Sequence, residues 1–133
     1  MQNTETAFHW IIDLLEKNNI QFRISGGFAA RLYGSNRPLY DIDIEIKDRD
    51  FDRLMPLVKE KIIYGPARYQ DEVFDLFLAT LEFEGQEIDL CGCETTRLFN
   101  HQTGEWERTP SILMRSPLKK FTAKKFPSYR GKI

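Results

Sequence analysis

The chain has 133 residues, 41% hydrophobic and 29% charged, and this balance predicts one soluble globular domain over residues 1–133. The formal net charge is −1, but segment 115–133 holds seven Lys and Arg residues and no acid, so an acidic body precedes a basic C-terminal segment. A pI of about 6.1 disfavours a dedicated nucleic-acid binder, although the aromatic residues of the basic segment leave an RNA contact open. No apolar run approaches the ~20 residues of a membrane span, so we expect a cytoplasmic protein with no membrane partner.

The N-terminal third predicts two helix and strand pairs. Residues 4–18 carry apolar side chains at helical spacing, with Thr4 as a candidate N-cap, and residues 21–25 read as a strand. A second helix is expected over residues 26–34, which begin with two glycines, and a second strand over residues 40–46. The expected buried face of the first helix consists of Ala7, Trp10, Ile11, Leu14 and Leu15.

The remaining chain predicts one longer helix and a β-hairpin. The helix spans residues 48–61, with Asp48 as its N-cap and Pro56 as a kink or an early end. The hairpin spans residues 73–93 and turns around residues 84–86. No element is assigned to residues 94–110, a strand is expected over 111–116, and a helix after Ser116-Pro117. The elements together predict an α/β (α+β) fold with a mixed, mostly antiparallel sheet and helices packed on one side.

The segment YDIDIEI (residues 40–46) alternates acids with isoleucines. Side chains of a strand alternate between its faces, so the acids face away from the isoleucines, which pack in the core. Two ionised carboxylates that converge raise each other's pKa, and a cation such as Mg²⁺, which prefers oxygen ligands, would relieve this. The alternation also fits a half-exposed edge strand whose charges deter aggregation. The acids are Asp41, Asp43 and Glu45, and the isoleucines are Ile42, Ile44 and Ile46.

Two other segments point to a phosphate and metal site. Ser25, Gly26 and Gly27 lie where a strand leads into a helix, and free backbone N–H groups there favour an anion. A glycine pair also occurs in ordinary tight turns. Farther on, Asp89 lies between Ile88 and Leu90 and could join the first two acids as a metal ligand or a general base, provided the two strands are neighbours. The alternative for Asp89 is an exposed strand acid.

These residues together resemble the nucleotidyltransferase superfamily that includes DNA polymerase β. Within it, the segment ISGGFAARLYGSNRPLYDIDIEI looks most like the lincosamide and aminoglycoside nucleotidyltransferases. Asp89 takes the place of the third acid of the family. A looser match near the C-terminus places Lys124, Arg130 and Lys132 at basic family positions. The matching positions of the first segment are Gly26, Gly27, Phe28, Arg37, Asp41, Ile42 and Asp43.

The resemblance implies transfer of a nucleoside monophosphate from an NTP to a hydroxyl of a small molecule, protein or RNA. It implies that Asp41, Asp43 and Asp89 hold Mg²⁺ or Mn²⁺ and form the catalytic site. The implied nucleotide and phosphate ligands are Ser25, Gly26, Gly27, Arg37 and Lys124. For Arg37, a salt bridge to the acidic strand is an equal alternative. The alternative function is a nucleotide-binding or partner-binding module of the same fold without turnover, as in antitoxin-like relatives.

Two further expectations concern the acceptor side and other metals. The family continues beyond the match with an acid and a further helix, so we expect a shortened acceptor-binding part and a homodimer that completes the cleft. Cys91, Cys93 and His101 lack a fourth zinc ligand, and the sequence disfavours a zinc site. Glu45 and Lys47 match the Glu-x-Lys motif of metal-dependent nucleases. Those enzymes carry the preceding Asp on a separate strand, whereas Asp41 and Asp43 lie on the same strand as Glu45, so the sequence disfavours a nuclease.

Overall fold

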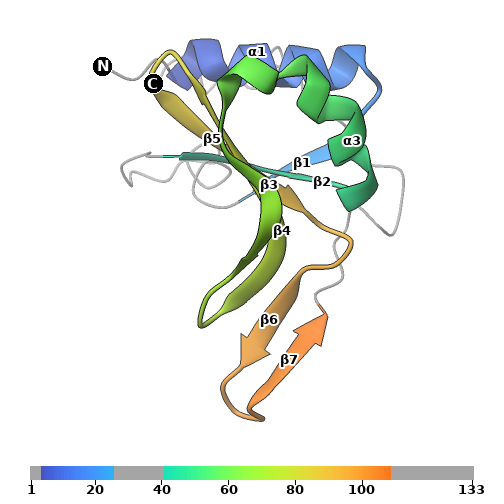
Figure 1. Cartoon of the computed structure of the whole chain (residues 1–133), viewed down its shortest axis with the longest axis vertical. Helices are drawn as coiled ribbons and strands as arrows, with labels where there is room; N and C mark the ends of the chain where they lie inside the picture. The colour runs from blue at the N-terminus through green and yellow to red at the C-terminus, as the bar shows by residue number, and fades with distance from the viewer. Residues whose placement is uncertain (1–3, 26–40, 109–133) are drawn as a thin grey trace.

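The computed structural model describes residues 4–25 and 41–108, and Figure 1 shows how their helices and strands are arranged. The helix expected over 26–34 and the strand and helix expected after residue 110 lie outside the described residues. The helical elements are α1 (Thr4–Lys17), η1 (Asp48–Asp50), α3 (Phe51–Leu54), η2 (Met55–Leu57) and η3 (Lys59–Lys61). The strands are β1 (Phe22–Ser25), β2 (Asp41–Ile46), β3 (Ile62–Gln70), β4 (Phe74–Phe83), β5 (Gln86–Gly92), β6 (Arg97–Asn100) and β7 (Glu105–Arg108).

The described strands form one sheet of seven, in the order β1-β2-β5-β4-β6-β7, with β3 on the other edge of β4. The pair β2 and β5 is parallel, and the remaining pairs are antiparallel. Helices α1 and α3 lie on the same side of the sheet (Figure 1). The predicted mixed, mostly antiparallel sheet with helices on one side is confirmed. Among the described residues, no helix is long and apolar enough to cross a membrane.

The core lies between the sheet and these helices. Strand β2 alternates as predicted, with its three isoleucines fully buried and its three acids half-buried on the opposite face. Of the face predicted for α1, Ala7, Ile11 and Leu15 are fully buried, whereas Trp10 and Leu14 are only partly buried. The helix instead buries two residues missing from that prediction, Phe8 and Ile12.

The helix predicted over 48–61 is confirmed only in part. The segment forms α3 and three short 3-10 turns, and the expected interruption at Pro56 is present, since Pro56 lies in the second of these turns. Proline has no N–H to donate to the preceding turn, so a regular helix cannot continue through it. Asp48 makes no cap. Its carboxylate instead accepts hydrogen bonds from the Glu94 N–H at 2.9 Å and from the Thr95 hydroxyl.

The hydroxyl of Thr4 also bonds outside its own helix. It donates to Oε1 of the fully buried Gln86 at 2.6 Å, which ties the start of α1 to the start of β5. A buried side-chain amide needs such a partner, because an unsatisfied polar group in the core is costly. The candidate N-cap therefore serves a tertiary contact.

The predicted hairpin is confirmed as β4 and β5. Its two turn residues, Glu84 and Gly85, have positive φ angles of 50° and 82°. A two-residue turn of this kind matches the twist of antiparallel strands and fixes their register. Phe83 therefore lies opposite Gln86, and six residues of β4 pair in sequence with β5.

The elements not predicted, β3, β6 and β7, extend the sheet away from α1 (Figure 1). A buried aspartate on β4, Asp75, joins β3 and β6 to that strand. Its carboxylate accepts hydrogen bonds from Arg68 of β3, with Nε at 2.7 Å, and from Arg97 of β6, with Nε at 2.9 Å. These two guanidinium groups lower the pKa of Asp75, in that order of effect, so the junction stays ionised.

Truncation of a core isoleucine tests the central role of β2. Ile44 is 0% exposed, and its replacement by Ala is expected to lower the unfolding free energy by about 2–5 kcal/mol because it leaves a cavity. The same change at Ile63, which is 53% exposed on β3, should cost less than ~1 kcal/mol. Urea unfolding of the two variants gives the comparison, and equal losses would contradict the placement of β2 in the core.

Candidate active site

A row of polar side chains crosses four neighbouring strands on the open face of the sheet. Ser25 of β1 lies opposite Asp43 of β2. Asp43 in turn lies opposite Asp89 of β5, which lies opposite Thr80 of β4. Neighbouring strands are about 4.8 Å apart, so the two aspartates are adjacent on one face. The strands of Asp43 and Asp89 are thus neighbours, the condition on which the sequence argument for a shared site depended.

The hydroxyl of Thr80 donates a hydrogen bond to Asp89 Oδ1 at 2.7 Å. This bond holds one carboxylate oxygen of Asp89 toward β4 and leaves the other available. Sequence reasoning missed Thr80, although the two-residue turn of the hairpin was a signal for it, since that turn pairs Thr80 with Asp89.

A second acidic row lies beside the first. Asp41 is opposite Glu87 on β5, and Glu87 is opposite Glu82 on β4. Both glutamates are exposed, and neither was singled out from the sequence. Glu45 lies on the same face of β2, on the other side of Asp43 from Asp41. Its carboxylate is 3.3 Å from the guanidinium of Arg23, so the charge of this acid is balanced by an ion pair.

The electrostatics of the aspartate row favour a bound cation. Burial, then the charge of Asp89 and then that of Asp41, raise the pKa of Asp43 to about 6. The pKa of Asp89 is also raised, mainly by burial and further by Asp41, against the lowering effect of the Thr80 hydrogen bond. A cation placed between these carboxylates would favour their charged forms and reverse the repulsion.

The row borders a cleft of about 680 Å³. One end of the cleft is polar and acidic, and the rest is largely apolar. No Lys, Arg or His belongs to its lining, as far as the described residues go. The lining consists of Ser25, Asp43, Glu45, Tyr69, Asp71, Phe74, Leu76, Leu78, Thr80, Asp89, Cys91, Gly92, Thr96 and Leu98.

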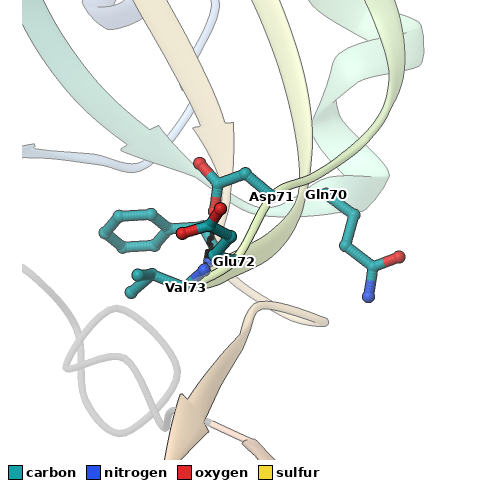
Figure 2. Close-up of a pocket in the computed structure, with 5 residues that line it drawn as sticks. Gln70, Asp71, Glu72 and Val73 are labelled. Atoms are coloured by element: carbon teal, nitrogen blue, oxygen red, sulfur yellow. Dashed lines mark hydrogen bonds between the residues drawn. The ribbon is translucent and has the colours of Figure 1, made fainter.

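The far end of the cleft meets the turn between β3 and β4, drawn in Figure 2. A second hollow of about 580 Å³ lies there and shares Asp71 and Phe74 with the cleft. Asp71 Oδ1 accepts hydrogen bonds from the Val73 and Phe74 N–H groups, at 2.8 and 2.7 Å. Its Oδ2 accepts one from the Tyr69 hydroxyl at 2.9 Å. These bonds lower the pKa of Asp71, so a negative charge stands at this end as well.

Cys91 lies in the cleft next to the aspartate row. Burial raises the pKa of its thiol to about 12, with further contributions from Asp43, Asp89 and Glu45. The thiolate is the reactive form of cysteine, so this residue stays protonated and unreactive at neutral pH.

Whether the acids suit a divalent cation can be judged from their chemistry. Across residues 4–25 and 41–108, no three His, Cys, Asp or Glu side chains are gathered into a preassembled metal cluster. The hydrogen bond from Thr80 explains why Asp89 does not join such a cluster, since it turns one carboxylate oxygen toward β4. The donor set nevertheless fits Mg²⁺, because carboxylates at i and i+2 of one strand face an adjacent carboxylate and carry uncompensated negative charge.

The other predicted ligands, Gly26, Gly27, Arg37 and Lys124, lie outside the described residues. Of the predicted phosphate ligands, Ser25 is the one that the structure describes, and it ends β1 beside Asp43. The structure thus brings together Ser25, Asp43 and Asp89 in one row and places Asp41 in the next.

Comparison with solved structures identifies the fold. The chain is similar to the crystal structure of a putative nucleotidyltransferase from Thermotoga maritima, with a TM-score of 0.70. The match covers 86% of this chain and 70% of that chain at 20% sequence identity. No protein-family model matches the sequence, and no curated protein matches it. The chain therefore has a nucleotidyltransferase-like fold.

The raised pKa of Asp43 leads to a prediction about stability. The pKa of Asp43 rises from 3.8 to about 6 on folding, so its ionisation costs more free energy in the folded state than in the unfolded state. This destabilisation is fully present above pH 6 and absent below pH 3.8, where the carboxyl is protonated in both states. Without divalent metal, Asp43→Asn should therefore raise the unfolding free energy at pH 7.5 by about 1–2 kcal/mol, allowing for partial solvent screening. The gain should shrink from pH 6 downward and vanish near pH 3.8.

Thermal and urea unfolding across this pH range measures the effect. Asp13→Asn, at an exposed position of α1, is the matched control and should change stability by less than ~0.5 kcal/mol at every pH. A loss of stability in Asp43→Asn at pH 7.5 would show that the carboxylate has a stabilising partner and would contradict the electrostatic account.

Proposed function

We propose that the chain is a Mg²⁺-dependent nucleotidyltransferase that moves a nucleoside monophosphate from an NTP to a hydroxyl acceptor. The observation that carries the proposal is the pairing of Asp43 with Asp89 on adjacent strands, with Asp41 on the same face of β2. Carboxylates on one open face suit a metal and triphosphate complex, because Mg²⁺ prefers oxygen ligands and is commonly held by one or two carboxylates together with substrate phosphates. The nucleotidyltransferase-like fold supports this interpretation. The finer likeness to lincosamide and aminoglycoside nucleotidyltransferases is proposed from the motif over residues 24–46.

In the proposed site, Asp41 and Asp43 hold Mg²⁺ or Mn²⁺, with Asp89 as a third ligand or as the general base. When bound, the ion would neutralise phosphate charge and favour an in-line displacement. Ser25 would donate its hydroxyl to a phosphate oxygen, aided by the Gly26 and Gly27 backbone. Arg37 and Lys124 are the proposed cationic contacts to the triphosphate.

The hydrogen bond between Thr80 and Asp89 supports the proposed role of Asp89 as base. The Thr80 hydroxyl occupies Oδ1, so Oδ2 is the oxygen available to accept a proton from the attacking hydroxyl. Burial raises the pKa of Asp89 and so makes it a better proton acceptor than an exposed aspartate. The acceptor oxygen forms a bond to the α-phosphorus, the bond from that phosphorus to the bridging oxygen breaks, and pyrophosphate leaves with that oxygen.

Two substitutions separate binding from chemistry. Asp43→Ala should abolish Mg²⁺-dependent binding of the NTP, because it removes a ligand of the metal and triphosphate complex. Asp89→Asn should retain binding and lower turnover by about 10²–10⁴-fold, the usual contribution of a general base. Calorimetry with ATP, GTP, CTP and UTP in the presence of Mg²⁺ measures the first effect, and pyrophosphate release measures the second.

Asp52→Asn, at an exposed position of α3, is the control and should leave both quantities unchanged. If none of the four nucleotides binds in a metal-dependent way, the nucleotidyltransferase proposal and the nucleotide-binding alternative both fail. Metal-dependent binding without pyrophosphate release from any NTP would favour the non-catalytic binding module.

A further inference from the structure

Beyond the aspartate row, the cleft continues as a surface that we call the apolar trough, formed by Tyr69, Phe74, Leu76, Leu78 and Leu98. Register explains why these side chains meet on one face. Tyr69 of β3 is opposite Leu76 of β4, and Phe74 of β4 is opposite Leu98 of β6. Leu78 precedes Thr80 by two positions on β4, so the trough begins directly beside the Thr80 and Asp89 pair.

The position of the trough points to one of the two substrates. In an in-line displacement, the attacking and leaving oxygens lie on opposite sides of the phosphorus. Ser25, the described phosphate ligand of the proposal, lies on β1, on one side of Asp43. Asp89 and then the trough lie on the other side. Pyrophosphate leaving toward β1 therefore places the attacking hydroxyl over Asp89 and the rest of the acceptor in the trough.

Charge narrows the chemistry of the acceptor. The lining of the cleft includes four carboxylates, from Asp43, Glu45, Asp71 and Asp89, and no basic side chain of the described residues. Asp71 stands at the end of the trough far from the aspartate row, and its hydrogen bonds keep it ionised. Glu45 is paired with Arg23, and Asp43 and Asp89 serve the metal and triphosphate in the proposed site, so Asp71 sets the charge of the trough itself. Its negative charge favours neutral or positively charged groups over anions.

The trough is held in shape from behind. Side chains alternate across β4, so Asp75 faces the opposite side from its trough neighbours Phe74 and Leu76. There it binds Arg68 of β3 and Arg97 of β6, the two strands that supply Tyr69 and Leu98. The ion cluster fixes the three strands that carry the trough, and a preformed apolar surface costs less to occupy.

We propose that the acceptor is a small alcohol with an apolar or aromatic body and no negative charge, which lies in the apolar trough with its hydroxyl at Asp89. A cationic substituent would lie toward Asp71. The inference rests on the proposed function. The hydroxyl gives its proton to Asp89 and its oxygen to the α-phosphorus, and pyrophosphate leaves, so the products are a nucleotidylated alcohol, pyrophosphate and a proton released to solvent.

A matched set of three alcohols tests the proposal on the full chain with NTP and Mg²⁺. The neutral probe is 4-methylbenzyl alcohol, the cationic probe is 4-(aminomethyl)benzyl alcohol, and the anionic probe is 4-(hydroxymethyl)benzoate. NMR of ¹³C-labelled leucine methyl groups should show shifts at Leu76, Leu78 and Leu98 with the first two probes, and at least tenfold weaker binding of the third. Equal binding of the anion, or shifts confined to leucines outside the trough, would overturn the proposal.

Variants of the trough test the same inference without a need for turnover. Leu76→Ala and Leu78→Ala should weaken binding of the neutral and cationic probes at least tenfold and leave the dissociation constant of the NTP unchanged. Leu78→Met, which keeps an apolar side chain of similar volume, should bind both probes within threefold of the unsubstituted protein. Leu57→Ala, 49% exposed and outside the cleft, is the control and should change neither constant. Unchanged probe binding in both alanine variants would overturn the proposal.

Failure of this inference can be told apart from failure of the proposed function. If the NTP binds with Mg²⁺ but no alcohol shifts the trough signals, the trough assignment is wrong and the proposed function stands. Preferred transfer to the 3′-hydroxyl of an RNA oligonucleotide would also show that the trough assignment is wrong, while the proposed function would stand. If no NTP binds, the proposed function fails first, and the acceptor assignment fails with it.

Discussion

The parallel pairing of β2 with β5 is the constraint on which the rest of the structure depends. It aligns Ile42 with Ile88 on the covered face and Asp43 with Asp89 on the open face. Because side chains alternate along a strand, a slip of one residue would turn acids into the core and isoleucines into the cleft. The residues that bury the apolar surface therefore also fix the relative positions of the carboxylates, and core and site have one common register.

The same pairing places like charges side by side. Burial and the neighbouring acids raise the pKa of Asp43, which means that folding without a cation opposes its ionisation. The core compensates, since every inward residue of β2 is fully buried. A structural acidic row would need a cationic partner, and in the described part Arg23 binds Glu45 rather than Asp43. Carboxyl groups with shifted pKa values in a cleft are typical of functional sites.

The parts predicted from sequence are those with strong local signals. Alternation predicted β2, and the Glu84-Gly85 turn predicted the β4 and β5 hairpin, so the sequence could indicate that acids of the two strands share one face. Strand β3 escaped prediction because most of its residues are exposed and no alternation marks it. Pro56 indicated an interruption of the helix over 48–61, but the apolar spacing did not show that most of this segment forms 3-10 turns. Thr80 and the trough depend on pairings between strands, which a single sequence does not display.

The aspartate row and the apolar trough belong to different groups of strands. Ser25, Asp43 and Asp89 belong to β1, β2 and β5, whereas the trough belongs to β3, β4 and β6. Only β4 carries both, through Thr80 at the aspartate row and Leu78 beside it. The Asp75 ion cluster anchors the second group of strands on the opposite face. Side chains of the trough can therefore be exchanged with little effect on the carboxylates, and in the proposed enzyme a change of acceptor would not disturb the site of transfer.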